Sequence, residues 1–214
     1  MSEHAFIPRD RDVVYRVIAE RRDMRHFAGG VVEEPVLARL LAAAHQAPSV
    51  GLMQPWRFVR IADLTLRQAL HDHVEQERRR TAEAMGERSD EFMRLKVQGI
   101  LDCAEVLVVA LGADRERHVF GRRTMPHMDL ASVSCAIQNL WLSARAEGLG
   151  MGWVSMFEPE VVGRLIGAPA GAEAVAILCL GPVDAFYPRP MLEQESWTVA
   201  RRLDELLAVD VWPD

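Results

Sequence analysis

Cysteine is scarce in this chain of 214 residues. It has three, Cys103, Cys135 and Cys179, and no CxxC pair. An odd number of widely separated cysteines excludes a disulfide framework and favours free thiols in a reducing compartment. The seven histidines form no set with ligand spacing, since His71 and His73 are too close in sequence to share one face of a helix. The sequence therefore predicts no metal site.

Long apolar runs are also missing. The longest falls well short of the roughly 20 residues that cross a membrane as a helix. The first twelve residues, MSEHAFIPRDRD, are charged and lack the apolar core of a signal peptide. We therefore expect a cytoplasmic protein with no membrane partner. The net charge of −6 argues against broad nucleic-acid binding, so no nucleic-acid partner is expected either.

Lysine is nearly absent, because Lys96 is the only lysine among 25 basic residues. Codon bias in an arginine- and alanine-rich genome is the commoner explanation of such an imbalance. Arginine nevertheless offers a planar fork that matches the oxygens of a phosphate group, and lysine does not. The many arginines thus leave room for a local anion site in an acidic protein.

What is present is typical of a folded domain. Apolar residues make up 50% and charged residues 26% of the chain, and at about 150 residues per domain the length predicts one domain, two at most. The apolar pattern predicts helices over 9–22, 33–47, 63–98 (two helices broken at Met85-Gly86), 129–147 and 158–166, and strands over 57–61, 105–113 and 174–181. Few strands among long helices indicate an α+β fold, with a small mixed sheet flanked by helices on both faces.

Three arginines cluster where the first helix is expected to end. Arg21, Arg22 and Arg25 stand within five residues, with Asp23 between them. Arginine side chains can fork onto phosphate oxygens. In isolation, a solvated basic turn with Asp23 as a salt-bridge partner is the commoner explanation. If the turn lines a pocket, the same carboxylate becomes a general-base candidate.

Two further segments have the composition of ligand-binding loops. Residues 47–56, APSVGLMQPW, combine small and rigid residues, which let the backbone approach a flat ligand, with serine and glutamine. Residues 148–157, GLGMGWVSMF, place three glycines before a strand that ends near Ser155. Each is weak alone, since a helix end followed by a strand explains the second. No GxGxxG follows a strand and neither GxxxxGKS nor HExxH occurs, so a Rossmann or P-loop site is unsupported.

In combination these segments are far more specific. RR-D-x-R-x-F, then A-P-S-x-x-x-x-Q-P-W-x-F, then a glycine-ended helix and Gly152-Trp153 resemble the FMN-dependent nitroreductase superfamily over about 9–207. Asp23 stands where the typical member has serine, and Leu52 where it has asparagine. Residues 124–157, SVGLMQPW and LCLGPVDAFYPRPMLE look like one branch, the BluB family of 5,6-dimethylbenzimidazole synthases.

The resemblance implies a nitroreductase-like three-layer fold and one FMN-binding domain over 1–214. It also implies a homodimer with FMN at two sites in the subunit interface. The long, charge-rich stretch 63–98 is either a solvated helical pair or a lid insertion over the site, with Phe92, Met93 and Leu95 available to face the flavin. Residues 182–214 would form a swapped tail that embraces the second subunit.

The resemblance also implies an activity. Reduced FMN, supplied by a separate flavin reductase, reacts with O2 and is fragmented to 5,6-dimethylbenzimidazole, the lower ligand base of vitamin B12, and erythrose 4-phosphate is released. One alternative is an NAD(P)H-dependent nitro- or flavin reductase on the same fold, and another is a non-enzymatic flavin carrier. Asp23, Leu52 and the 124–157 stretch favour the synthase.

Residue roles follow from the same resemblance. Asp23 and Ser155 are the expected catalytic residues, with Asp23 accepting protons during fragmentation. Lys96 falls near the pyrimidine edge of the flavin, where a cation favours the reduced anionic form. The full set expected to bind FMN is Arg21, Arg22, Asp23, Met24, Arg25, Pro48, Ser49, Gly51, Lys96, Gly152, Trp153, Ser155 and Arg201.

The tail departs from the family pattern. Members read W-x-x-R-L-P-L, whereas this chain reads Trp197-Thr-Val-Ala-Arg201-Arg202-Leu203. The arginine is displaced by one residue. The sequence therefore leaves open whether Arg201 or Arg202 contacts the phosphate.

Overall fold

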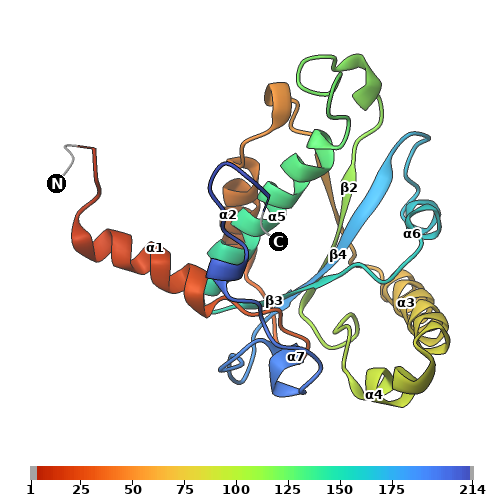
Figure 1. The fold of residues 1–214 in the computed structure, drawn as a ribbon. Helices are drawn as coiled ribbons and strands as arrows, with labels where there is room; N and C mark the ends of the chain where they lie inside the picture. The colour runs from red at the N-terminus through yellow and green to blue at the C-terminus, as the bar shows by residue number, and fades with distance from the viewer. Residues whose placement is uncertain (1–3, 213–214) are drawn as a thin grey trace.

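A four-stranded sheet lies between two layers of helices (Figure 1). In the computed structural model, which describes residues 4–212, the strands lie side by side in the order β1-β2-β4-β3. Each strand is antiparallel to its neighbours. The strands are β1 (Trp56–Arg60), β2 (Glu105–Leu111), β3 (Gly150–Val154) and β4 (Glu173–Gly181).

The two central strands, β2 and β4, are the ones that the continuous apolar runs predicted. Every residue of β2 is buried, and so are the last six of β4. A strand covered on both faces gains nothing from alternating polar residues, so its sequence becomes an unbroken apolar run. The expected strands at 105–113 and 174–181 are confirmed.

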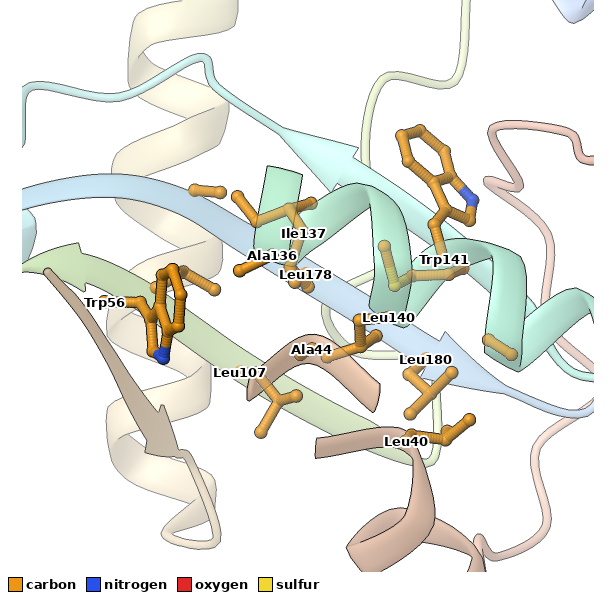
Figure 2. Packing of buried hydrophobic residues seen from close by; sticks show 14 of the residues in the cluster. Leu40, Ala44, Trp56, Leu107, Ala136, Ile137, Leu140, Trp141, Leu178 and Leu180 are labelled. Atoms are coloured by element: carbon orange, nitrogen blue, oxygen red, sulfur yellow. The ribbon is translucent and has the colours of Figure 1, made fainter. Parts of the chain in front are cut away.

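Helices α2 (Glu34–His45) and α5 (Met128–Ala146) cover one face of the sheet. Leu40 and Ala44 of α2 and Leu140 of α5 pack against Leu107 and Leu180 of the central strands (Figure 2). Helices α3 (Leu64–Ala84) and α6 (Pro159–Leu165) cover the opposite face and enclose a second apolar cluster. The predicted three-layer α+β architecture is therefore confirmed.

The charge-rich stretch after β1 forms two helices that meet at a turn. Asp63 accepts a hydrogen bond from Leu66 N (2.8 Å) at the start of α3. Gly86 adopts a left-handed φ of 59° directly after α3, which is the usual place for glycine at a helix end. A short 3-10 turn, Gly86–Arg88, then leads into α4 (Ser89–Arg94). The predicted break at Met85-Gly86 is confirmed.

The remaining elements are short, apart from the first helix α1 (Pro8–Glu20). Three single 3-10 turns and one four-residue helix occur in the connections and the tail: Val50–Leu52, Arg115–Arg117, α7 (Met191–Gln194) and Leu203–Glu205. The expected strand near residue 57 and the helix near 158–166 are present as β1 and α6.

Parallel pairing is confined to one edge of the sheet. Asp23 forms an isolated parallel bridge with Met151 of β3, and Met24 N donates to Met151 O (2.9 Å). The four strands themselves all pair antiparallel. The predicted mixed sheet is thus mixed only at this bridge.

Two apolar surfaces lack a partner within the described part of one chain. Helix α1 projects away from the sheet (Figure 1) and buries no residue, although its sequence has an apolar face. The tail exposes a second apolar group: Leu203, Leu206, Leu207, Val209, Val211 and Trp212. Val13, Val14, Val17 and Ile18 share one face of α1, and none of them is buried within one chain, although α1 contacts α5.

The close approach of residues 23–24 to β3 depends on Gly152. A Cβ atom on Gly152 would lie 2.2 Å from the carbonyl oxygen of Met24. Backbone must shift to relieve such a contact, and overpacking of this kind costs about 1–3 kcal/mol. We expect Gly152→Ala to lower the free energy of unfolding by that amount in urea titrations.

Gly163→Ala in α6 is the matched control, since its new Cβ would meet only Ala168 Cβ, at 3.9 Å. It should leave stability unchanged or raise it by about 0.5–1 kcal/mol, because alanine favours the helix. Equal stability of the two variants would show that the 23–24 segment does not depend on this glycine.

Candidate active site

The basic turn 21–25 is held in an extended conformation beside the sheet. Helix α1 ends at Glu20, and Arg21 already has extended backbone angles (φ −60°, ψ 134°). The bridge of Asp23 to Met151 then fixes the alternation of side chains along the segment. Met24 enters the core, where it is 1% exposed, so its two neighbours face away from the core.

Asp23 is held by both a backbone amide and an arginine. Its Oδ1 accepts a hydrogen bond from Trp153 N (3.0 Å), and its Oδ2 forms an ion pair with Arg25 Nη2. The same Arg25 Nη2 donates to Trp153 O (2.8 Å). Burial raises the pKa of the Asp23 carboxyl above its ordinary value, and the neighbouring Arg25 charge opposes that rise. The side chain is still 41% exposed, so its carboxylate can meet a ligand.

A cavity of about 240 Å³ opens beside Asp23. Ser155 follows the last residue of β3 and reaches the cavity as an exposed residue. We call it the Asp23 cavity. It is lined by Asp23, Arg25, Met85, Phe92, Leu95, Val97, Trp153, Val154, Ser155, Met156, Met191, Leu192 and Trp197. Most of these side chains are apolar, with one ion pair and one hydroxyl at the wall.

A second cavity of about 250 Å³ adjoins the first, and we call it the Arg21 cavity. Its lining is Ile18, Ala19, Arg21, Arg22, Asp23, Pro190, Met191 and Leu192. Asp23, Met191 and Leu192 line both cavities, so the carboxylate stands at their junction. One cavity thus has an arginine-rich wall and the other a mainly apolar wall.

The two arginines of the Arg21 cavity are held differently. The Arg21 guanidinium carbon lies 4.5 Å from the centre of the Trp141 ring, and burial lowers its pKa. Arg22 donates to the carbonyl oxygens of Ala19 (2.7 Å), Arg21 (2.8 Å) and Pro188 (3.2 Å). Arg22 therefore ties the tail to the end of α1, and the Arg21 fork has no carboxylate bonded to it among the described residues.

Several buried donors at the site have no acceptor within the described chain. They are Arg22 Nε, the Nε and Nη1 atoms of Arg25 and Trp153 Nε1. Buried donors are nearly always hydrogen-bonded in folded proteins. Donors left over beside two cavities fit a ligand that carries acceptor oxygens, such as a phosphate or a ring carbonyl.

The cover of the Asp23 cavity comes from two distant segments. Met85, Phe92, Leu95 and Val97 belong to the expected lid, and Met191, Leu192 and Trp197 belong to the tail. As expected, Phe92 and Leu95 face the cavity, whereas Met93 does not line it and is 37% exposed. The tail residues were not among the expected site residues. In the sequence, Trp197 is recognisable only as part of the tail motif, and the motif does not indicate which residues this tryptophan contacts.

Other expected residues lie elsewhere in one chain. Lys96 pairs with Asp102 and lines a charged groove on the other side of the 95–98 segment. Arg201 is exposed and lies 3.7 Å from Glu205, and Arg202 pairs with Asp204 (2.6 Å). The structure of one chain brings neither arginine into the two cavities.

The loop with Pro48, Ser49 and Gly51 also lies outside both cavities. Ser49 Oγ accepts from Gln54 N (3.1 Å), and Val50 N donates to Ser132 Oγ of α5 (3.0 Å). One chain therefore gathers residues 21–25 and 152–155, and it does not add residues 48–51 to them.

Residues 4–212 contain no group of three or more histidine, cysteine, aspartate or glutamate side chains placed to hold a metal ion. Within the same range, no helix is both long enough and apolar enough to span a membrane.

Known proteins share this fold and much of this sequence. The sequence model of the Nitroreductase family matches residues 18–182. A 5,6-dimethylbenzimidazole synthase from Rhodospirillum rubrum is 41% identical over 201 residues, which cover 92% of this chain and 94% of that protein.

Two solved structures share the fold. A BluB-like flavoprotein from Clostridium difficile superposes with a TM-score of 0.67 at 19% identity, over 92% of this chain and 98% of that one. An iodotyrosine deiodinase bound to FMN and 3-iodo-L-tyrosine gives 0.68 at 24% identity, over 88% and 97%. The chain therefore belongs to the nitroreductase family and, within it, to the BluB family of 5,6-dimethylbenzimidazole synthases.

Proposed function

We propose that this protein converts reduced FMN and O2 to 5,6-dimethylbenzimidazole and erythrose 4-phosphate. One observation carries the proposal: Asp23, a carboxylate with a raised pKa, stands at the junction of an arginine-lined cavity and an apolar one. That arrangement suits a molecule with an anionic end and a flat ring. The curated relative with 41% identity is named for this product.

The residues present fit FMN as the substrate. Arg21 and Arg22 would hold the phosphate, because arginine forks pair well with phosphate oxygens. The isoalloxazine ring would lie in the Asp23 cavity, among Phe92, Leu95 and Trp153. When bound, reduced FMN supplies both the electrons that reduce O2 and the atoms of the product.

The chain's own groups then handle protons and exclude water. Asp23 accepts protons at its carboxylate. Its raised pKa makes it a stronger base than an ordinary carboxylate, and a general base works best when its pKa lies near the working pH. Trp153 N fixes Oδ1 and Arg25 fixes Oδ2, so the carboxylate keeps one orientation. Ser155 adds a hydroxyl, able to donate or accept, to the wall of the same cavity.

A nitro- or flavin reductase on the same fold is the second candidate. It would need an open flavin face on which a nicotinamide ring could stack. Phe92, Leu95 and Trp197 line the Asp23 cavity, where they would compete with a nicotinamide ring for the face of a bound flavin. We therefore favour a separate flavin reductase as the source of reduced FMN, with residues 63–98 acting as the lid.

The apolar surfaces of α1 and of the tail support a homodimer. Helix α1 buries none of its residues within one chain, and Trp212 of the tail is 90% exposed. Exposed apolar surface of this extent marks a protein contact. In a dimer, residues 48–51, Lys96 and Arg201 of the two chains could complete the two sites. Of the proposed tail 182–214, residues 213–214 lie outside the described part.

The first experiment is a product assay. The FMN-loaded protein is reduced chemically without oxygen, then exposed to air, and the products are identified by mass spectrometry. We expect 5,6-dimethylbenzimidazole. In a parallel stopped-flow experiment, NADPH alone should leave the absorbance of bound FMN unchanged, because the cavity is covered. Rapid bleaching by NADPH together with no benzimidazole product would establish the reductase instead.

The second experiment replaces Asp23 with asparagine. Asp23→Asn should still bind FMN but lose product formation by roughly 100-fold or more, since a general base typically contributes that much. In the native protein, product formation should fall as the pH is lowered through the raised pKa of Asp23, above the range of an ordinary carboxylate. If Asp23→Asn formed nearly as much product as the native protein, and its product formation fell at the same low pH, Asp23 would have no part in the mechanism.

Arg21→Ala is the contrasting variant in that experiment. It should weaken FMN binding about 10-fold or more, because a charge-assisted hydrogen bond to phosphate is lost. Riboflavin, which lacks the phosphate, should lose much less affinity. Equal losses for both flavins would contradict a phosphate role for Arg21.

The third experiment measures assembly. Sedimentation equilibrium should show a dimer, and Val14→Asp on the exposed face of α1 should shift it toward monomer, since an apolar contact does not accept an unpaired charge. Arg16→Gln, an exposed position on the same helix, changes the net charge by the same one unit and is the control. A native monomer at micromolar concentration would contradict the dimer.

A further inference from the structure

Trp197 links the C-terminal tail to the segment that covers the Asp23 cavity. The guanidinium carbon of Arg88 lies 3.6 Å from the centre of the Trp197 ring, and Arg88 Nη2 donates to Trp197 O (3.2 Å). On α4, the ring of Phe92 lies 6.1 Å from that of Trp197, centre to centre, at 55°. These contacts join residues more than a hundred positions apart.

The backbone before Trp197 is shaped to present this side chain. Helix α7 ends near Gln194, and Ser196 adopts a left-handed φ of 56°. Trp197 N then donates back to Leu192 O (2.8 Å), as in a Schellman motif. Glycine is the residue that usually takes this conformation, so serine here carries strain that the surrounding contacts must offset. The turn thereby directs the indole back over the cavity.

The position of Trp197 decides how well the cavity is covered. Trp197 packs with Phe92 and Leu95 in a small apolar cluster, separate from the two main clusters of the core, and all three line the Asp23 cavity. Arg88 stacks on the indole and also pairs with Glu91 (Nε to Oε2, 2.8 Å), and its side chain is 50% exposed. A cation–π contact that is open to solvent is weak, so the cover can release to admit a ligand and close again.

We propose that Trp197 is a positioning residue that closes the Asp23 cavity during the reaction, held in place by Arg88 and Phe92. The proposal rests on the proposed function. Trp197 would limit a side reaction, the simple oxidation of reduced FMN. In that reaction reduced FMN passes two electrons and two protons to O2, which gives oxidised FMN and hydrogen peroxide. Keeping water out of the cavity favours fragmentation over that outcome.

The test compares Trp197→Ala and Trp197→Phe with the native protein. Each is loaded with reduced FMN and exposed to air, and the benzimidazole formed and the peroxide released are measured per flavin oxidised. Trp197→Ala should make about fivefold less benzimidazole, with a matching rise in peroxide, since water enters the cavity. Trp197→Phe keeps a ring against Phe92 and should restore most of the product.

A second measurement needs no turnover. Iodide quenching of the fluorescence of bound, oxidised FMN reports how open the cavity is. Quenching should increase in Trp197→Ala and, less strongly, in Arg88→Gln. Arg94→Gln is the matched control. It also removes one guanidinium from this segment, but the Arg94 side chain has no recorded contact with Trp197. Quenching in this variant should equal that of the native protein.

The outcomes separate this inference from the proposed function. Unchanged product partition and unchanged quenching in Trp197→Ala would overturn the role of Trp197. If Trp197→Ala fails to fold, Arg88→Gln takes its place in both measurements. A ratio of benzimidazole to peroxide and a quenching that both equal those of the native protein would then overturn the role of Trp197. If the native protein makes no benzimidazole, the proposed function fails, and the quenching series still shows whether Trp197 closes the cavity.

Discussion

The short pairing of residues 23–24 with the edge strand β3 is the contact on which the site depends. It consists of one bridge, Asp23 to Met151, and one hydrogen bond, Met24 N to Met151 O. By adding an extended segment to the sheet, it sends Met24 into the core and leaves the flanking charged residues at the cavities. Gly152 makes the approach possible, because any side chain there would meet the backbone of Met24.

The architecture follows from local patterns that need no partner to be understood. The apolar runs of β2 and β4, and the break at Gly86, are each decided by residues within about ten positions, and the structure has them as expected. Helix α1 also has an apolar face, and none of its residues is buried within the described chain. A sequence pattern identifies an apolar face and cannot say what covers it.

The site divides in the same way. Residues 21–25 and Ser155 converge because both flank β3, and the motif order was enough to group them. Lys96 lies away from Asp23: Lys96 and Gln98 line the charged groove, Val97 lines the Asp23 cavity, and Leu95, directly after α4, lines both. If the segment 95–98 were shifted by one residue, Lys96 would face the Asp23 cavity, and the local sequence does not determine which position it takes. The tail contacts were out of reach because they join segments far apart in sequence.

Helix α1 has a consequence for how the molecule is assembled. A 13-residue helix with no buried side chain lies at the length where isolated helices in water are only marginally formed. Its helix–coil equilibrium is therefore set by whatever covers its apolar face. Ile18 and Ala19 of this helix line the Arg21 cavity, and so do Arg21 and Arg22 directly after it. Unfolding of the helix would therefore disorder one wall of that cavity. In the proposed homodimer, ligand binding and subunit association would both stabilise the same helix, so ligand affinity would depend on protein concentration.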